Sequence, residues 1–137
     1  MTSAYEILPH ASDLKVKATG TTRAGFLVGA MRGMFATAGA KWVEDAPEAE
    51  RPFKITANDF ETLLVDLLGS ALAASAANSE AYEDIKFTLI TDKKAEGAFV
   101  GRKVSGFKKR IMAAAKHDLA IAKNETGAWE STITFDV

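Results

Sequence analysis

Residues 129–137 read WESTITFDV, and this stretch alternates between apolar and polar side chains. A period of two is typical of a half-buried β-strand, because successive side chains of a strand point to opposite faces. The sequence stops one residue after Asp136, so we expect an ordered end that holds the carboxylates of Asp136 and Val137 in place. Fixed carboxylates suggest a hard cation or a docking surface. The apolar face is predicted to hold Trp129, Ile133, Phe135 and Val137, and the polar face Glu130, Thr132, Thr134 and Asp136.

The first half of the chain predicts strands at residues 5–8 and 14–18, followed by a helix. Apolar residues recur at helical spacing over residues 26–38. Thr21 or Thr22 is expected to cap the start of this helix, and Gly39 to end it.

A solvated loop is predicted over residues 43–52, then a strand over residues 53–57. Asn58 and Glu61 resemble a capping box at the start of a second helix, whose leucines run from Leu63 to Leu72. This helix is expected to fray over residues 75–79.

The remaining sequence predicts mainly strands. The expected strands are residues 85–91, 95–104 (broken by Gly97 and Gly101), 111–115, 119–122 and 129–137, with turns at 92–94 and 124–127. The order of elements indicates an α+β fold, with two helices packed on one face of a mainly antiparallel or mixed β-sheet. We expect residues 1–137 to form a single domain, because 137 residues are enough for one hydrophobic core.

The net charge and the lack of cysteine argue against several classes of protein. A net charge of −1 argues against attraction of the whole molecule to nucleic acid or to an anionic membrane. Cysteine is absent, which excludes disulfides, thiolate zinc sites and cysteine nucleophiles. The sequence shows no secretory signal and no stretch expected to span a bilayer, so a cytoplasmic location is expected.

Two histidines lie beside aspartates. His10 and Asp13 follow Pro9 at the mouth of a predicted strand, where Asp13 either coordinates a cation or caps a turn. His117 precedes Asp118 and, by strand parity, is expected to be half buried on the side of Leu119. With Asp136, Asp13 gives an oxygen-rich pair of the kind that calcium or magnesium prefers.

A basic run over residues 102–110 either contacts RNA or an acidic partner, or is a solvated hairpin loop. It holds Arg102, Lys103, Lys108, Lys109 and Arg110. Phosphate-loop, dinucleotide and nucleophile-elbow motifs are absent from the sequence, and no nucleophile is paired with a base. Catalysis is therefore not expected.

Several segments, in this order, resemble the archease family. Residues 5–14, YEILPHASDL, are similar to the archease opening, in which a tyrosine-glutamate pair leads to His-Thr-Ala-Asp. The other similar segments are GTT at 20–22, MRGMF at 31–35, LLVDLL at 63–68, KHDL at 116–119, WE at 129–130 and FDV at 135–137. The chain departs from the family pattern at Ala11-Ser12, Gly69-Ser70, Met112 and Ala115-Lys116.

The resemblance implies a non-catalytic helper of the RNA ligase that joins 3′-phosphate or cyclic-phosphate ends to 5′-hydroxyl ends in tRNA splicing and RNA repair. Such helpers promote guanylylation of the ligase and allow multiple turnovers. The resemblance also implies a metal site made by Asp13, Asp136 and the Val137 carboxylate, with Glu6 as a weaker candidate. His10 and His117 are accessory candidates from their positions beside aspartates. The alternative is a chaperone-like or RNA-binding module that uses the basic run.

Overall fold

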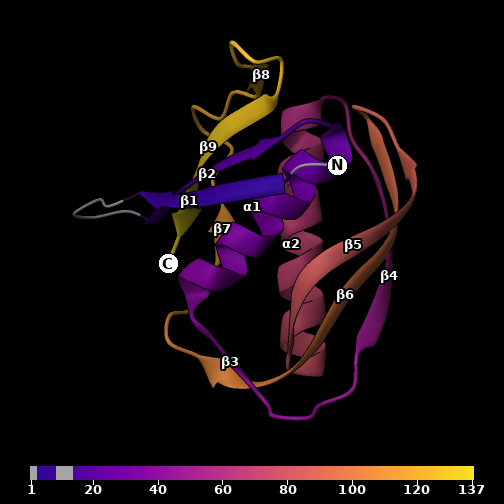
Figure 1. Ribbon diagram of the computed structural model, residues 1–137, viewed down its shortest axis with the longest axis vertical. Helices are drawn as coiled ribbons and strands as arrows, with labels where there is room; N and C mark the ends of the chain where they lie inside the picture. Colours follow the sequence, from indigo (N-terminus) through magenta and orange to yellow (C-terminus); the bar gives the residue numbers. More distant parts are fainter. Residues whose placement is uncertain (1–2, 9–13) are drawn as a thin grey trace.

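The computed structural model describes residues 3–8 and 14–137. Two helices lie between two antiparallel sheets (Figure 1). The first sheet has the order β1-β2-β9-β7, with β8 also paired to β9. Its strands are β1 (Ser3–Leu8), β2 (Leu14–Gly20), β7 (Ala113–Ala114), β8 (Ala122–Lys123) and β9 (Trp129–Asp136).

In the second sheet, β6 is central and pairs with β4 and β5 along its length and with β3 at its end. Its strands are β3 (Ala40–Trp42), β4 (Ala49–Thr56), β5 (Glu80–Ile90) and β6 (Lys94–Phe107). The α+β class is thus confirmed, but the strands form two sheets where one was expected. The segment after β6 donates amides to the end of a helix (Lys109 N–H to Ala38 O, 3.0 Å) and so does not continue the sheet.

Helix α1 (Arg23–Ala38) has the predicted ends. The Thr22 hydroxyl accepts a hydrogen bond from the Gly25 amide at 3.0 Å, which satisfies one of the unpaired donors of the first turn. Gly39 ends the helix in the left-handed conformation, with φ of 69°. The helix packs on β1 and β2 on one side and on β5 on the other, and so joins the two sheets.

Helix α2 (Phe60–Asn78) differs from its prediction at both ends. Its N-cap is Asp59 and not Asn58, because the Asp59 carboxylate accepts from the Thr62 amide at 2.7 Å. Hydrogen bonding to the Thr62 side chain, and then to its amide, holds the pKa of Asp59 below its ordinary value. Glu61 closes no capping box and accepts instead from the Ile121 amide at 3.0 Å. The helix does not fray at residue 75 but continues to Asn78.

The two glycines expected to break β6 allow it to remain continuous. Gly101 and Gly97 lie opposite the two register shifts of β5, where the backbones come close. A Cβ at Gly101 would collide with the Ala81 carbonyl, and one at Gly97 with the Lys86 carbonyl. These glycines therefore permit strand pairing at the bulges.

Other boundaries also shift. The predicted loop over residues 43–52 is shorter, because β4 begins at Ala49. The predicted strands over 111–115 and 119–122 reduce to β7 and β8, since most of residues 108–121 have no regular secondary structure. The hairpin turn at 124–127 is confirmed, with the Gly127 amide donating to Asn124 O at 2.9 Å.

The core lies where both helices meet both sheets. Leu63, Leu64, Leu67 and Leu68 of α2 are fully buried there. Contrary to the expectation from sequence, α2 is long and apolar enough to cross a membrane by length and composition alone. A core helix passes the same test, and its buried leucines account for that composition.

Candidate functional site

Asp136 occupies the end of β9 on its solvent-facing side. Ile133 and Phe135 are buried, as the alternation predicts, while Asp136 is exposed. The Asp136 carbonyl accepts a hydrogen bond from the Met112 amide at 2.8 Å, and Ala113 is its Cα partner in β7. Pairing on this side fixes the backbone of Asp136 and leaves its carboxylate open to solvent.

The register of β2 and β9 brings the beginning of one strand to the end of the other. Leu14 is the Cα partner of Phe135, and Lys15 that of Thr134. Asp13 and His10, the N-terminal candidates, lie outside the described residues.

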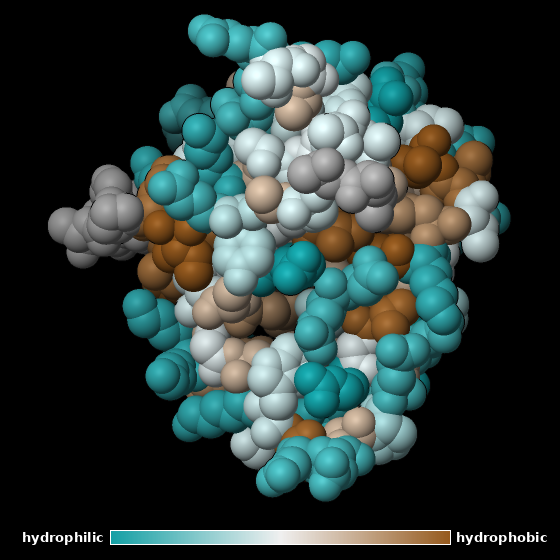
Figure 2. Space-filling model, in the orientation of Figure 1, coloured by the Kyte–Doolittle hydropathy of each residue, from teal (hydrophilic) through white to brown (hydrophobic). Residues whose placement is uncertain are grey.

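Val137 follows β9 and is 65% exposed, so it does not share the buried face predicted for it. Figure 2 shows an apolar area over the ends of β1 and β2, next to the residues drawn in grey. Ile7 of β1 is 47% exposed. The end of the first sheet therefore offers apolar side chains as well as a carboxylate.

Glu6 lies far from Asp136 along the first sheet. It is the Cα partner of Lys17, which is in turn the partner of Thr132 in β9. Thr132 precedes Asp136 by four residues, and strands rise about 3.3 Å per residue, so the separation along the strands is about 13 Å. The two carboxylates do not share one cation at that separation.

His117 is exposed, and the prediction of half burial is wrong. Its side chain is 90% exposed and lies 3.1 Å from the Asp118 carboxylate. The expected strand parity does not apply because residues 116–119 form a turn, with the Leu119 amide donating to Lys116 O and Asp118 at a φ of 59°.

The described residues contain no group of three or more acidic or histidine side chains that could hold a metal ion. Asp136 supplies carboxylate oxygens, which suit calcium or magnesium. A complete site therefore needs ligands from outside residues 3–8 and 14–137, where Asp13 is the sequence-predicted partner.

The basic run divides into two parts, one of them engaged in the fold. Arg102 lies 3.3 Å from the Glu83 carboxylate and 4.9 Å from the centre of the Trp42 ring. The Lys103 ammonium donates to Asn78 O at 2.6 Å. Both residues belong to β6 and not to a hairpin loop.

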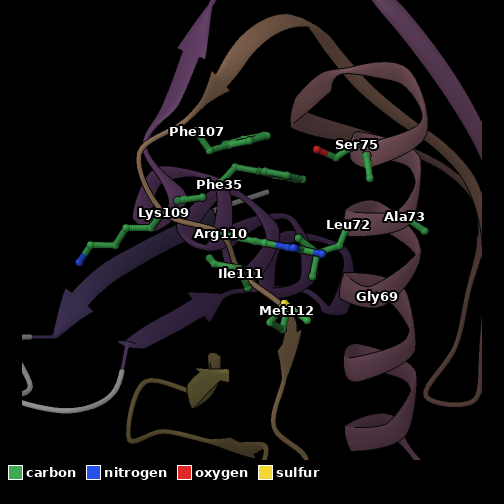
Figure 3. Close-up of a pocket in the computed structure, with 12 residues that line it drawn as sticks. Phe35, Gly69, Leu72, Ala73, Ser75, Phe107, Lys109, Arg110, Ile111 and Met112 are labelled. Carbon is green, nitrogen blue, oxygen red and sulfur yellow. The ribbon is translucent and has the colours of Figure 1, made fainter. Parts of the chain in front are cut away.

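The second part follows β6. Lys108, Lys109 and Arg110 are exposed, and none forms an ion pair with any described residue. We call these three cations the basic rim. Two of them, Lys109 and Arg110, line a groove of about 580 Å³ (Figure 3). Sequence reasoning missed the groove, although Gly69 in the middle of a leucine-rich helix was a usable signal.

The strongest side-chain network is remote from these features. Glu80 of β5 is 1% exposed and accepts two hydrogen bonds from the Arg51 guanidinium, both at 2.8 Å, and one from the Tyr82 hydroxyl at 2.9 Å. The Arg51 bonds hold the pKa of Glu80 below its ordinary value, and burial raises that of Tyr82. The network ties β4 to β5.

Comparison with solved structures shows the same fold. An archease of Thermotoga maritima, described as a possible chaperone, is 18% identical, with a TM-score of 0.65 and 96% of each chain covered. Protein 1598 of Methanobacterium thermoautotrophicum is 20% identical, with a TM-score of 0.69 and coverage of 98% of this chain and 99% of that one.

Comparison by sequence was made with curated proteins and with family models. None of the curated proteins matches the chain. The model of the archease protein family (MTH1598/TM1083) matches residues 5–137, which include both ends of the first sheet and both helices. The chain belongs to the archease family.

Proposed function

We propose that this chain is a non-catalytic protein cofactor that promotes guanylylation and turnover of a 3′-phosphate RNA ligase in tRNA splicing or RNA repair. The observation that carries the proposal is the family match over residues 5–137. A chaperone-like role agrees with it, because a helper of this kind acts on another protein. We expect it to work in the cytoplasm.

We further propose that Asp13, Asp136 and the Val137 carboxylate hold a divalent cation, calcium or magnesium. Support comes from the strand register, in which Leu14 and Phe135 are Cα partners. Asp13 is next to Leu14 in the sequence, and Asp136 is next to Phe135. When bound, the cation would offer a concentrated positive charge to oxygen ligands of the partner. Asp136 is exposed, as this role requires.

The helper would act by binding one state of the ligase more tightly than another. A ligand shifts a conformational equilibrium only through its difference in affinity for the two states. The carboxylates and the exposed Ile7 and Val137 would contact the state that accepts guanylate. This mechanism needs no bond to be made or broken by the chain itself.

The proposal is tested by adding the chain to a 3′-phosphate RNA ligase and measuring transfer of label from radiolabelled GTP to the ligase. We expect the chain to raise the rate of guanylylation and the number of ligations per ligase molecule. No change in either quantity with a folded chain would contradict the proposal.

The cation is tested separately by calorimetric titration with Ca²⁺ and with Mg²⁺. We expect Asp13→Asn and Asp136→Asn to weaken binding, and Asp92→Asn to leave it unchanged. Asp92 is an exposed aspartate in the turn between β5 and β6, and so it controls for the loss of one surface charge. Equal binding by all three variants would remove the cation from the proposal.

A second candidate function, a chaperone-like or RNA-binding module, is favoured by the basic rim alone. Lys108, Lys109 and Arg110 are exposed cations without ion pairs among the described residues, whereas Arg102 and Lys103 are engaged in the fold. RNA binding through them would weaken steeply with salt, because neutralised phosphates release counterions. Unchanged RNA binding after alanine replacement of the three would count against it.

A further inference from the structure

The groove beside α2 has one wall of small side chains and one wall of extended backbone. Gly69, Ala73 and Ala76 line it from α2 and are exposed to solvent. Ile111 and Met112 line it from the segment that follows β6. Figure 3 shows that this segment runs alongside α2, with the side chains between them. The floor is thus apolar and reachable from outside.

Hydrogen bonds at both ends hold the extended wall in place. The Lys108 and Lys109 amides donate to Gly39 O and Ala38 O, at 3.2 and 3.0 Å, which satisfies carbonyls at the end of α1. At the other end, the Met112 amide donates to Asp136 O at 2.8 Å. The groove is therefore formed before a ligand arrives, and binding does not need to order its walls.

The end of the groove is aromatic. Phe35 of α1 and Phe107 of β6 stack with ring centres 6.2 Å apart and planes at 25°. Both rings line the groove. At its lip, Met112 is 57% exposed, and a flexible, polarisable thioether is well suited to a protein-binding surface.

Gly69 is a helix-interior glycine that its surroundings do not require. A Cβ added there would meet nothing within 4 Å, so no contact in the described part of the chain excludes alanine. Glycine in the middle of a helix lowers stability by roughly 0.5–1 kcal/mol relative to alanine. Its absence of a side chain keeps the groove open at mid-length.

Arg110 gives the groove its charge preference. Figure 3 shows the Arg110 guanidinium directed toward α2 beside Leu72, and the Lys109 ammonium directed away from the groove. Among the described residues that line the groove, none is acidic. A guanidinium binds a carboxylate through two parallel hydrogen bonds, so Arg110 selects an acidic group on an apolar ligand.

We propose that this groove binds an acidic, amphipathic peptide segment of a partner protein. Apolar side chains of the segment fill the space beside Gly69 and against Phe35 and Phe107, and a carboxylate pairs with Arg110. Lys108 and Lys109 are exposed next to Arg110 in the sequence, so acids of the segment that lie outside the groove would also meet positive charge. The proposal is independent of the ligase and of the cation.

RNA fits the same surface less well. Phosphates would use the basic rim, but the floor offers small aliphatic side chains and no exposed ring for a base to stack on, apart from the partly buried Phe107. An RNA strand would also gain nothing from the open space at Gly69. Dependence on Gly69 therefore separates the two ligands.

The test is selection of a random dodecapeptide library, displayed on phage, against the full chain. Enriched peptides are then synthesised with a fluorescent label, and their affinities are measured by anisotropy. We expect peptides that combine glutamate or aspartate with apolar residues. Arg110→Glu should weaken binding at least roughly tenfold, because it replaces a charged hydrogen bond with repulsion.

Three variants complete the design. Gly69→Trp fills the groove and should abolish peptide binding, whereas Gly69→Ala should retain it within about twofold. Lys93→Glu, an equal charge reversal in the distant turn between β5 and β6, should leave the affinity unchanged. Circular dichroism establishes that each variant is folded. Because Arg110 is exposed, Arg110→Glu still tests the proposal if the helix does not tolerate tryptophan at position 69.

Two results would overturn the proposal. One is failure of the peptide arm: the library yields no acidic amphipathic peptides, or the enriched peptides bind wild type and Gly69→Trp equally well. The other is a labelled single-stranded RNA that binds the chain through Arg110 without regard to Gly69, while peptides do not bind. That second result would assign the basic rim to nucleic acid.

Discussion

The two sheets differ in how their charged side chains are used. In the second sheet, Glu80 is buried and fully paired, and the carboxylates of Glu50 and Glu83 lie 2.8 and 3.3 Å from Lys86 and Arg102. In the first sheet, Asp136 ends its strand with the carboxylate exposed. Under the proposed function, the first sheet carries the site, and the paired charges of the second sheet serve the fold.

The largest loss of stability is expected from the core of the second sheet. Phe99 is 1% exposed and stacks on Phe53 at 4.4 Å and near Tyr82 at 5.5 Å. Phe99→Ala should lower the free energy of unfolding by about 3–5 kcal/mol, measured by urea denaturation. Thr132→Ala, on the exposed face of β9, should cost no more than about 0.5 kcal/mol. Similar losses would contradict the assignment of Phe99 to the core and of Thr132 to the open face.

Removing the charge of Glu80 is expected to have a smaller effect. Glu80→Gln weakens the bonds from Arg51 and Tyr82 and should cost about 1–3 kcal/mol near neutral pH. Arg51→Met should cost more than Glu80→Gln, because it leaves a buried carboxylate without its cation.

The same network predicts a pH dependence. The pKa of Glu80 is lowered in the folded state, so its contribution is present above the ordinary value of 4.5 and is lost as the pH falls through the lowered value. Wild type should lose more stability than Glu80→Gln when denaturation is compared at neutral pH and in acid. Parallel losses would show that Glu80 is not the group responsible.

A gain of stability is expected at the groove. Gly69→Ala adds a methyl group in open space and restores helix propensity, which should stabilise the chain by roughly 0.5–1 kcal/mol. Thermal unfolding followed by circular dichroism measures this difference. A destabilised Gly69→Ala would mean that the helix needs glycine for its own packing.

The smallest change in stability is expected for Asp136→Asn. Asp136 is exposed, and its backbone bond with Met112 does not involve the carboxylate. The variant should remain within about 0.5 kcal/mol of wild type in urea denaturation. A large loss would make the carboxylate part of the fold, contrary to the role assigned to the first sheet.

Local pattern predicted the elements well, since it follows from side-chain spacing within one segment. The alternation in β9 and the cap at Thr22 are of this kind. Contacts between distant segments were not predictable. Strand β6 stays continuous at Gly97 and Gly101 because of the bulges in its partner β5. The strands split into two sheets because the segment after β6 donates its amides to the end of α1.

The candidate site shows the same limit. Alternation placed Asp136 on the open face of its strand, and the resemblance to archeases supplied Asp13 as its partner. The predicted burial of His117 assumed a strand, in which alternate side chains point to the same face. Residues 116–119 form a turn instead, with Asp118 in the left-handed conformation, and His117 is exposed. The groove combines α1, α2 and the segment after β6, and no single stretch of sequence contains that combination.

The central claim is that an open carboxylate on the first sheet acts on a partner and not on the fold. It is tested most directly by guanylylation of a 3′-phosphate RNA ligase in the presence of wild type, Asp136→Asn or the matched control Asp92→Asn. We predict that Asp136→Asn loses the stimulation while its melting temperature stays at the wild-type value, and that Asp92→Asn stimulates fully. Full stimulation by folded Asp136→Asn would contradict the claim.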